Sequence, residues 1–461
     1  MYYIVENNIR IRKWAGHPPV YDVNGKRKFH HLDQDEYALL KSCDGFTELS
    51  PNKTLYRMEL MRLIRRCRKG EASLKPDQIR EYPNHYIWGI EWTITERCNF
   101  NCLHCFHAAD NKRQRAEFSR EEAFRLLREI KECGVTGISL TGGEPTLYPY
   151  LRDVMTKARN LRLPLDSLVT NGAGLDEDMV GFIKDLYPRV QIRLSFDGIG
   201  THDWLRQHEG AEEQVKDTIR RCKKAGLYVK INMNVNRRNR DVIFDSSVML
   251  SDMGVDELRI IKTTEAPRWQ LNAAGNSLTI EEYFDFSAAF AGKYKDYGLT
   301  LPVTIWHSLY LHGKTQVFSA LPVKSSQCNY HDDLPLCEGM INKLSIQANG
   351  EIVPCGPLAG LFALKDIHLG NVKHDGLQKL LTGGSVIETI SHTVGEKRSH
   401  NRQCGTCPYF MNCQGGCPAL SALYNGSFLE PDPAKCAFFL GDYYNTFCHV
   451  LEGWKNKKPV P

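Results

Sequence analysis

The feature that most constrains the fold is a regular alternation of predicted strands and helices in the middle of the chain. From Tyr86 onward, apolar stretches of strand length are separated by amphipathic stretches of helical period. One of these, SREEAFRLLREIKECG, predicts a helix with a capping box at Ser119 and Glu122 and an end at Gly134. The predicted strands are YIWGIEWTIT, TGISLTGG, LDSLVTNG, VQIRLSFDG, YVKINMNVN and ELRIIK. About six β/α units predict an α/β fold with a parallel sheet curved into a partial (β/α)6 barrel.

The alternation divides the chain of 461 residues into three predicted domains. Residues 1–85 are expected to form a small winged-helix-like domain, and residues 86–309 the barrel. Residues 310–461 are rich in Cys, Gly and Pro, and from about Tyr310 the strand–helix alternation stops. A loop-rich domain of this kind needs additional links, which cysteines can supply as metal ligands.

Within the first domain, local signals predict a hairpin followed by helices. The stretch VYDVNGKRKFHHL has the type I′ turn residues Asn24-Gly25 between its two apolar parts. Asp33 is the expected N-cap of a first helix. A second helix is expected from Leu55 to Cys67, followed by a linker that contains Pro76 and Pro83.

Cysteine is the unusual residue of the composition. The chain has 16, and eight of them lie between Cys328 and Cys436. In a long chain without a signal-peptide pattern, clustered cysteines indicate metal sites rather than disulfides. The net charge of +5 does not by itself indicate a nucleic acid or a membrane. With no apolar run of membrane-spanning length, a cytoplasmic location is expected.

Three cysteines follow the first predicted barrel strand, in the stretch ERCNFNCLHCF. Cys98, Cys102 and Cys105 provide three thiolates on one loop, where a zinc ribbon needs four ligands. Three thiolates can hold a cubane iron–sulfur cluster by three of its irons and leave the fourth iron open to another ligand. A zinc loop and a set of three core thiols are the alternatives.

The spacing Cys-x3-Cys-x2-Cys followed by the aromatic Phe106 resembles the signature of the radical S-adenosylmethionine (SAM) enzymes. The resemblance implies a 4Fe–4S cluster on Cys98, Cys102 and Cys105, whose open iron chelates the amino and carboxylate groups of SAM. Reduction then cleaves SAM to methionine and a 5′-deoxyadenosyl radical, which removes a hydrogen atom from the substrate. Phe106 is included among the cofactor-binding residues on the same basis.

The stretch TGGEP, at the end of the second predicted strand, also resembles this family. Gly142 and Gly143 are expected to let the backbone approach a ligand closely. Glu144 is expected to accept hydrogen bonds from the methionine ammonium group of SAM. The alternative is a plain strand-to-helix turn.

Residues at later strand ends contact SAM in relatives, which makes Asn171 and Ser195 candidates, and Arg206 in HDWLRQ is a candidate partner of the SAM carboxylate. Ser195 is expected near the carboxylate or ribose. Asn171 has the alternative of a left-handed turn residue before Gly172, and Arg206 that of an exposed helix arginine. Asp197 is expected to cap its own loop rather than touch the cofactor.

The cysteines near the C-terminus match the seven-cysteine spacing of the SPASM extension, found on radical SAM enzymes that modify peptides and proteins. The resemblance implies two auxiliary 4Fe–4S clusters. The inner cluster is expected to have Cys328 as a fourth ligand or, without it, an open iron for a substrate thiolate. A zinc site built from the last five cysteines of the pattern is the alternative. The implied ligands are Cys404, Cys407, Cys413 and Cys436 for the outer cluster, and Cys337, Cys355 and Cys417 for the inner one.

The first domain resembles the RiPP recognition element, which reads the leader peptides of ribosomally made natural products. An extended leader would add as a strand to the sheet edge near Lys28 to His31. The basic residues Lys26, Arg27 and Lys28 would attract an acidic leader. A nucleic-acid-binding winged helix and a purely structural cap are the alternatives.

Together these resemblances predict a peptide maturase of the sactipeptide or ranthipeptide type, which installs a cross-link, most simply a cysteine thioether, in a precursor peptide. A flavodoxin or ferredoxin is the expected electron donor, and neither nucleic acid nor a membrane is an expected partner. An anaerobic sulfatase-maturing enzyme, which makes formylglycine, is the nearest alternative. Those enzymes carry an acid after the second inner-cluster cysteine, where this chain has Gly356. An iron–sulfur or zinc regulator that binds nucleic acid is an alternative of another class.

Overall fold

The computed structural model describes residues 1–105, 117–263, 267–324 and 330–456. Two residues with predicted roles, Phe106 and Cys328, lie outside the described residues.

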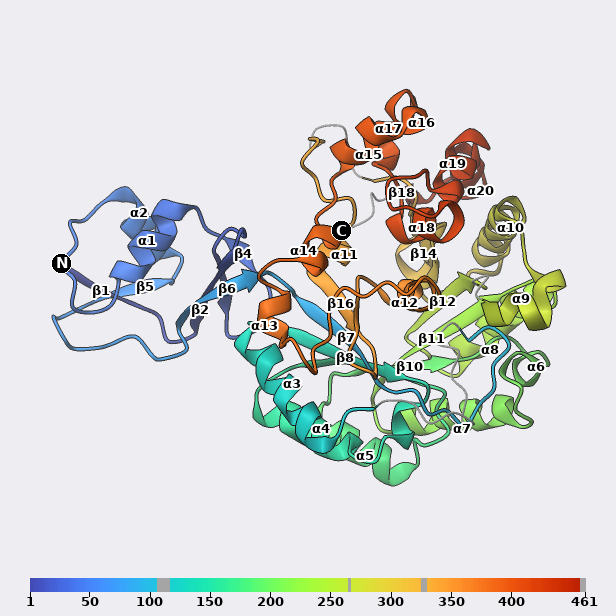
Figure 1. Cartoon of the computed structure of the whole chain (residues 1–461), viewed down its shortest axis with the longest axis horizontal. Helices are drawn as coiled ribbons and strands as arrows, with labels where there is room; N and C mark the ends of the chain where they lie inside the picture. The colour runs from blue at the N-terminus through green and yellow to red at the C-terminus, as the bar shows by residue number, and fades with distance from the viewer. Residues whose placement is uncertain (106–116, 264–266, 325–329, 457–461) are drawn as a thin grey trace.

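The predicted barrel strands form one curved sheet in which each strand is parallel to its neighbours (Figure 1). A further parallel strand, β13, follows the sixth predicted strand in the same sheet. The α/β fold with a partial barrel is therefore confirmed. The strands in spatial order are β7 (Gly89–Thr95), β8 (Gly137–Gly142), β9 (Leu165–Thr170), β10 (Gln191–Ser195), β11 (Tyr228–Val235), β12 (Glu257–Lys262) and β13 (Val303–Ile305).

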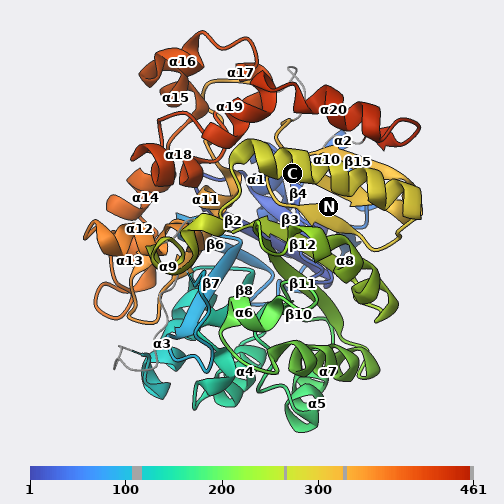
Figure 2. The ribbon, with the colours of Figure 1, turned by 90° about the vertical axis from the view of Figure 1, so that its right-hand side faces the viewer.

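Helices pack on the outer side of this sheet (Figure 2). Their apolar faces and the alternate residues of the strands build one continuous core, in which Leu140, Ile192 and Ile231 are fully buried. The predicted capping box of Ser119 and Glu122 opens α3. The helices of this part are α3 (Arg120–Glu132), α4 (Leu151–Asn160), α5 (Glu177–Leu186), α6 (His202–Arg206), α7 (Ala211–Lys224), α8 (Ile243–Asp252), α9 (Pro267–Ala273) and α10 (Ile280–Tyr297).

The sheet does not stop where the strand–helix alternation stops. Strands from the cysteine-rich part extend it at both ends, so the region after Tyr310 contains more regular structure than the expected loop-rich domain. Strand β16 pairs in parallel with β7 and covers an edge that would otherwise expose unpaired backbone groups. The added strands are β14 (Leu309–His312), β15 (Val317–Ala320), β16 (Lys343–Ile346), β17 (Ile352–Val353) and β18 (Lys455–Asn456).

Short helices carry most of the remaining chain and its cysteines. These helices are α11 (Glu338–Asn342), α12 (Ala359–Leu364), α13 (Leu377–Leu380), α14 (Ser385–Ile390), α15 (Val394–His400), α16 (Arg402–Gly405), α17 (Phe410–Cys413), α18 (Pro418–Asn425), α19 (Pro433–Leu440) and α20 (Tyr443–Val450). The later ones, from α15 to α20, lie above the barrel strands in Figure 1.

The N-terminal part is a separate lobe of small sheets and helices beside the barrel (Figure 1). The predicted hairpin is present as β3 and β4, but six residues rather than two connect its strands, with both Asn24 and Gly25 in the left-handed region. Asp33 and Glu36 form the capping box of α1. The elements are β1 (Tyr2–Val5), β2 (Ile9–Ala15), β3 (Val20–Val23), β4 (His30–His31), α1 (Gln34–Ser42), α2 (Lys53–Leu60), β5 (Ile64–Cys67) and β6 (Ile79–His85).

The second helix ends earlier than expected. It stops at Leu60, and the residues from Ile64 to Cys67 form a strand that pairs antiparallel with β1. Arg62 adopts a φ of 56°, and the N–H of Leu63 donates to the carbonyl of Met58, which is the geometry of a Schellman cap. A glycine normally marks such a cap, and this sequence lacks that signal.

The expected linker also contains structure. Strand β6 pairs in parallel with β2, and the pairing shifts register around Pro83, which a strand at a sheet edge can tolerate. This strand helps to dock the N-terminal part onto the barrel. Tyr82 stacks on Trp14 with ring centroids 5.1 Å apart, and the indole N–H of Trp14 donates to the carbonyl of Cys133 at 3.1 Å.

No helix within the described ranges has both the length and the apolar character needed to cross a membrane.

Candidate functional site

The cysteine loop leaves the carboxyl end of β7, as the sequence predicts. Cys98 and Cys102 are buried, and Cys105 packs with them beside Phe100. Burial raises the pKa of Cys98 to about 12, so its thiol is protonated unless a metal or a cation stabilises the thiolate. Phe100 stacks on His208 with ring centroids 4.4 Å apart, which anchors the loop to the barrel.

A single metal ion and a cluster require different spacings of the cysteine sulfur atoms. Within the described residues, no three His, Cys, Asp or Glu side chains are arranged to hold a metal ion. In a tetrahedral zinc site the sulfur atoms lie only about 3.8 Å apart, because each Zn–S bond is about 2.3 Å long. A cubane spreads its thiolates over separate irons, so they lie farther apart.

Gly142 and Gly143 give the cysteine loop room to approach. A Cβ at Gly142 would lie 2.6 Å from the carbonyl oxygen of Thr95, and one at Gly143 would lie 2.7 Å from that of Glu96. The N–H of Gly143 donates to Thr95 and that of Glu144 donates to Arg97. The sequence predicted that a ligand would approach Gly142 and Gly143 closely. In the structure, the backbone of the cysteine loop makes this close approach.

Glu144 is fully buried, and protein donors already surround its carboxylate. Its Oε1 accepts from the N–H and hydroxyl of Thr146 and, at 2.6 Å, from the hydroxyl of Thr170. Its Oε2 accepts one hydrogen bond, from the N–H of Asn171 at 2.7 Å. Burial raises the pKa of Glu144, and these hydrogen bonds oppose that shift. Oε2 therefore retains one acceptor position for the expected ammonium group.

Asn171 joins the end of β9 to the cysteine loop. Its Nδ2 donates to Oδ1 of Asn99 at 2.7 Å, and its Oδ1 accepts from the N–H of Ala173. Its φ is not positive, so the alternative of a left-handed turn residue is wrong, and Gly172, with a φ of 90°, takes that conformation instead. Ser195 is the last residue of β10 and is half-buried.

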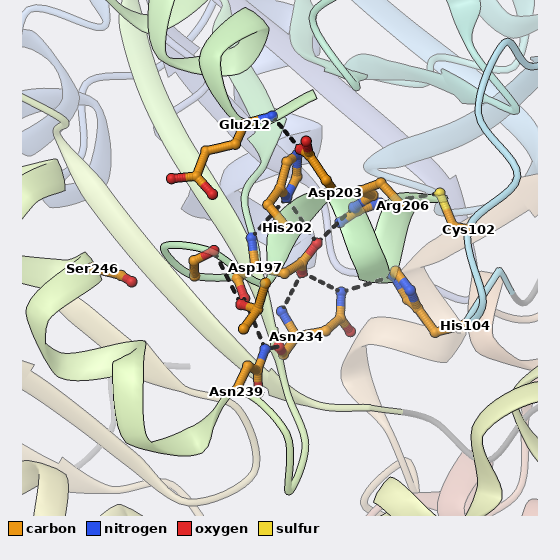
Figure 3. A network of polar contacts seen from close by, with 12 residues as sticks. Cys102, His104, Asp197, His202, Asp203, Arg206, Glu212, Asn234, Asn239 and Ser246 are labelled. Carbon is orange, nitrogen blue, oxygen red and sulfur yellow. Dashed lines mark hydrogen bonds and ion pairs between the residues drawn. The ribbon is translucent and has the colours of Figure 1, made fainter. Parts of the chain in front are cut away.

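Arg206 is buried, contrary to the alternative of an exposed helix arginine. Its Nε donates to Oδ2 of Asp197 at 2.6 Å, and its Nη1 donates to the sulfur of Cys102 at 3.7 Å (Figure 3). A buried guanidinium beside a cysteine sulfur favours the thiolate form. Nε and Nη1 are engaged in these contacts. The pairing of Arg206 with the SAM carboxylate remains a prediction.

Asp197 is the centre of a buried polar network rather than a simple loop cap (Figure 3). Besides Arg206, its carboxylate accepts from the N–H of Asn234 at 2.8 Å and lies 3.3 Å from Nδ1 of His202. The positive charge of Arg206 holds the pKa of Asp197 well below its usual range despite complete burial. Asn239 closes the network by donating to the carbonyl oxygens of Asp197 and Asn234.

The same network reaches into the cysteine loop through His104. His104 is buried, and its Nε2 lies 3.1 Å from Nδ2 of Asn234. Sequence reasoning did not identify His104, His202, Asn234 or Asn239. They share no spacing pattern, and the one available signal was the position of Asp197 directly after a barrel strand.

The neighbouring strands align Ser195 with a cationic side chain, that of Arg259. Ser195, Asn232 and Arg259 lie opposite one another on neighbouring strands. The guanidinium of Arg259 lies 3.5 Å from the ring centroid of Trp306, and within the described residues its buried Nε has no hydrogen-bond partner. Burial lowers the pKa of Arg259 to about 10, so it stays charged. This row of residues can bind a carboxylate.

The C-terminal cysteines gather into two sets. One set joins Cys404 and Cys407 with Cys413 and Cys436, which lie close enough to affect one another's pKa values. Burial raises the pKa of Cys436 to about 12. The second set joins Cys355 and Cys417 with Cys337, and burial likewise raises the pKa of Cys417 to about 12.

The turn between Cys413 and Cys417 separates the two sets. Gln414, Gly415 and Gly416 have φ values of 50°, 79° and 74°. Three successive left-handed residues reverse the chain within one turn, which directs the two flanking cysteines to different sets. The fourth ligand expected for the second set, Cys328, lies in a part of the chain that the structure does not describe.

Comparison with known protein families gives two matches. Residues 92–241 match the radical SAM superfamily, and residues 337–408 match the SPASM iron–sulfur cluster-binding domain. Among relatives, an AdoMet-dependent heme synthase of Methanosarcina barkeri (strain Fusaro / DSM 804) is 23% identical over 75% of this chain and 95% of that protein. The sporulation killing factor maturation protein SkfB of Bacillus subtilis (strain 168) is 28% identical over 38% of this chain and 42% of that protein.

Two solved structures share the fold. SuiB of Streptococcus suis, solved with its precursor peptide SuiA, has a TM-score of 0.66 at 15% identity, over 94% of this chain and 99% of that one. The enzyme anSMEcpe with bound AdoMet has a TM-score of 0.59 at 19% identity, over 78% of this chain and 96% of that one. The likeness to these two structures concerns the fold, whereas the two matched domains indicate a SAM-binding 4Fe–4S cluster, SAM and auxiliary clusters. The chain therefore contains a radical SAM domain and a SPASM iron–sulfur cluster-binding domain.

Proposed function

We propose that this enzyme is a peptide maturase that installs a cross-link, most simply a cysteine thioether, in a ribosomally made precursor. The observation that supports this most is the shared fold with SuiB, which was solved with a precursor peptide. A match over 94% of the chain must include most of the N-terminal lobe, residues 1–85. The likeness to anSMEcpe covers only 78% of the chain.

The side chains at the carboxyl ends of the strands have distinct roles in this proposal. Cys98, Cys102 and Cys105 hold the SAM cluster, with Arg206 stabilising the thiolate of Cys102 through its contact at 3.7 Å. Glu144 fixes the loop after β8 and accepts the methionine ammonium at Oε2. When bound, the cluster and SAM together supply the 5′-deoxyadenosyl radical that removes a hydrogen atom from the peptide.

The N-terminal lobe binds the leader of the precursor in this proposal. Strand β4 lies at an edge of its sheet and is exposed, so an extended peptide can pair with it. Fewer of the basic residues beside β4 are available to attract a leader than the sequence indicates. Arg27 pairs with Asp166 of the barrel at 2.5 Å, so Lys26 and Lys28 remain to attract acidic residues.

Forming a thioether requires an outlet for one electron. Removing a hydrogen atom from a carbon and joining that carbon to a cysteine sulfur releases the thiol proton and one electron. The auxiliary clusters, when bound by the two C-terminal cysteine sets, supply an acceptor for that electron. We assign Cys404, Cys407, Cys413 and Cys436 to the outer cluster, and Cys337, Cys355 and Cys417 to the inner one.

One observation favours the second candidate, oxidation of a peptide cysteine or serine to formylglycine. Gly356 follows Cys355, where sulfatase-maturing enzymes carry an acid. A Cβ at Gly356 would lie 2.8 Å from Oε1 of Glu91, so the carboxylate of Glu91 occupies the space beside that position. An acidic group is therefore present near Cys355 even though the sequence lacks one there.

The test is turnover of candidate peptides by the anaerobically reconstituted enzyme. SAM, a reductant and short cysteine-containing precursors with their leaders are added, and the products are weighed by mass spectrometry. We expect release of 5′-deoxyadenosine together with a peptide lighter by two hydrogens and a new thioether.

Two controls test the need for the cysteine loop and for the leader. A Cys98→Ala, Cys102→Ala, Cys105→Ala variant should release no 5′-deoxyadenosine, and a precursor without its leader should turn over far more slowly. Turnover restricted to sulfatase-type peptides would favour the formylglycine reaction. Turnover of an iron porphyrin, with no peptide modified, would overturn the peptide assignment.

A further inference from the structure

Two lysines are buried among the C-terminal cysteines. Lys397, on α15, has no exposed surface, and Lys435, on α19, is 7% exposed. Nζ of Lys397 donates to the hydroxyl of Ser421 at 2.9 Å and to the carbonyl oxygen of Phe428. Nζ of Lys435 donates to the carbonyl oxygen of Pro322. These partners satisfy hydrogen bonds but carry no charge.

Within the part of the chain that the structure describes, neither lysine has a carboxylate counterion. Across the described ranges, no Asp or Glu oxygen lies within 4.0 Å of either ammonium group. The acid that acts on both lysines is Asp432, which is itself buried. Its two oxygens accept from the N–H groups of Cys417 and Ala434, at 2.8 and 2.9 Å. The carboxylate of Asp432 therefore already accepts backbone hydrogen bonds, and it is one negative charge beside the two lysines.

Burial lowers the pKa of both lysines, so their ammonium form is kept only where another charge compensates it. The groups that oppose the effect of burial on the pKa of Lys397 when they are charged include Cys404, Asp432 and Cys413. For Lys435, Cys413 is such a group. These sulfur atoms are neutral as thiols and negative as cluster ligands, so only the cluster-bound state supplies the missing charge.

The backbone is also shaped around Lys397. A Cβ on Gly415 would lie 2.9 Å from Cδ of Lys397, so the turn between Cys413 and Cys417 has space for this side chain only because residue 415 is glycine. The lysine is thus built into the same turn that separates the two cysteine sets.

We propose that Lys397 and Lys435 raise the reduction potential of the outer auxiliary cluster and help to retain it. A cubane with thiolate ligands is negative, and reduction adds one more negative charge, which a fixed nearby cation stabilises. Both lysines act most strongly on Cys404 and Cys413 of the outer set. A raised potential of the outer cluster would favour movement of an electron from the inner cluster outward. This inference rests on the cysteine assignments made under the proposed function.

The test is an EPR-monitored redox titration of the reconstituted full-length enzyme. In Lys397→Met, one auxiliary signal should shift to a more negative potential, while the signal of the SAM cluster stays in place. Lys397→Arg keeps the charge and should keep the potential. Ser421→Ala removes a hydrogen bond but no charge, so its shift should be smaller than that of Lys397→Met. Lys379→Met, at a lysine whose side chain is 77% exposed, is the matched surface control.

Lys435→Met provides an independent second variant in case Lys397→Met does not fold. Loss of iron from Lys397→Met but not from Lys397→Arg would also support a role for the charge. Unchanged auxiliary potentials in both methionine variants, with full iron content, would overturn the inference and leave the cysteine assignments intact. Wild-type enzyme that binds only the iron of the SAM cluster would instead overturn the assignments, and the inference with them.

Discussion

Asp197 is a short acidic side chain that the fold removes completely from water beside the cysteine loop. Its charge is compensated by Arg206, whose guanidinium also contacts Cys102. The pair therefore links the end of β10 to a ligand of the proposed SAM cluster. Neither residue is distinguished in the sequence from an ordinary loop acid and an ordinary helix arginine.

Replacing Asp197 by Asn should leave Arg206 buried without a counterion. We expect a loss of about 3–5 kcal/mol in the free energy of unfolding, with a lower iron content on Cys98, Cys102 and Cys105. Urea titration, combined with hydrogen exchange at β10, measures the loss. The matched control is Asp217→Asn, which breaks an exposed pair with Arg220 and should change stability by about 1 kcal/mol or less. Equal effects of the two variants would refute the role of burial.

Replacing Gly143 by Ala should displace the cysteine loop. The added methyl group would meet the backbone of Glu96 and Arg97, which can move only with the loop. We expect weaker SAM binding and a lower iron content, measured by equilibrium dialysis and iron assay. Gly181→Ala is the control, because nothing lies within 4 Å of its Cβ position in the exposed face of α5. That variant should gain about 0.5–1 kcal/mol. Normal SAM binding by Gly143→Ala would show that the close approach is dispensable.

At the scale of elements, local sequence signals predicted the starts of those helices whose N-termini carry side-chain caps. The capping boxes at Asp33 and Ser119 place helix starts where the structure has them. The second helix was predicted too long because its end depends on Arg62 in a left-handed conformation, which no residue type announces. The residues after Arg62 form a strand rather than more helix because β1 offers them an edge to pair with.

Replacing Arg62 by Gly should therefore stabilise the N-terminal lobe. Glycine adopts the left-handed conformation without the penalty of about 1–2 kcal/mol that other residues incur, and the exposed Arg62 side chain contributes no ion pair within the described residues. Differential scanning calorimetry of the full chain should show a higher Tm for the lobe. Tyr56→Gly, at an exposed position within α2, should lower it, since glycine costs about 1 kcal/mol inside a helix. A lower Tm for Arg62→Gly would contradict this account of the helix end.

At the scale of the whole molecule, the position of the N-terminal lobe depends on contacts between distant parts of the chain. Trp14 packs against Tyr82 and Tyr86 and donates to Cys133 of the barrel. The ion pair of Arg27 and Asp166 lies at the same junction, where a Cβ on Gly137 would collide with it. These contacts fix the β4 edge relative to the barrel, which a leader-guided reaction requires.

Replacing Trp14 by Ala should loosen this junction. We expect a cost of about 3–5 kcal/mol and faster hydrogen exchange at β6 and around Gly134, while exchange at Leu40 in the lobe core stays slow. Trp88→Ala is the control, because Trp88 is 38% exposed and its removal leaves little empty space. Slow exchange at β6 in the Trp14 variant would mean that the remaining contacts hold the lobe in place.

The sequence by itself determined the α/β fold, the order of the barrel strands and the presence of the cysteine loop. These follow from hydrophobic period, caps and spacing, which are properties of neighbouring residues. Only the tertiary structure decided that β16 closes the edge of β7, that Asp197 and Arg206 are buried together, and that Lys397 lies among the C-terminal cysteines. Those outcomes depend on which strand edge and which counterion the folded chain brings near, and residues far apart in sequence carry no local sign of that proximity.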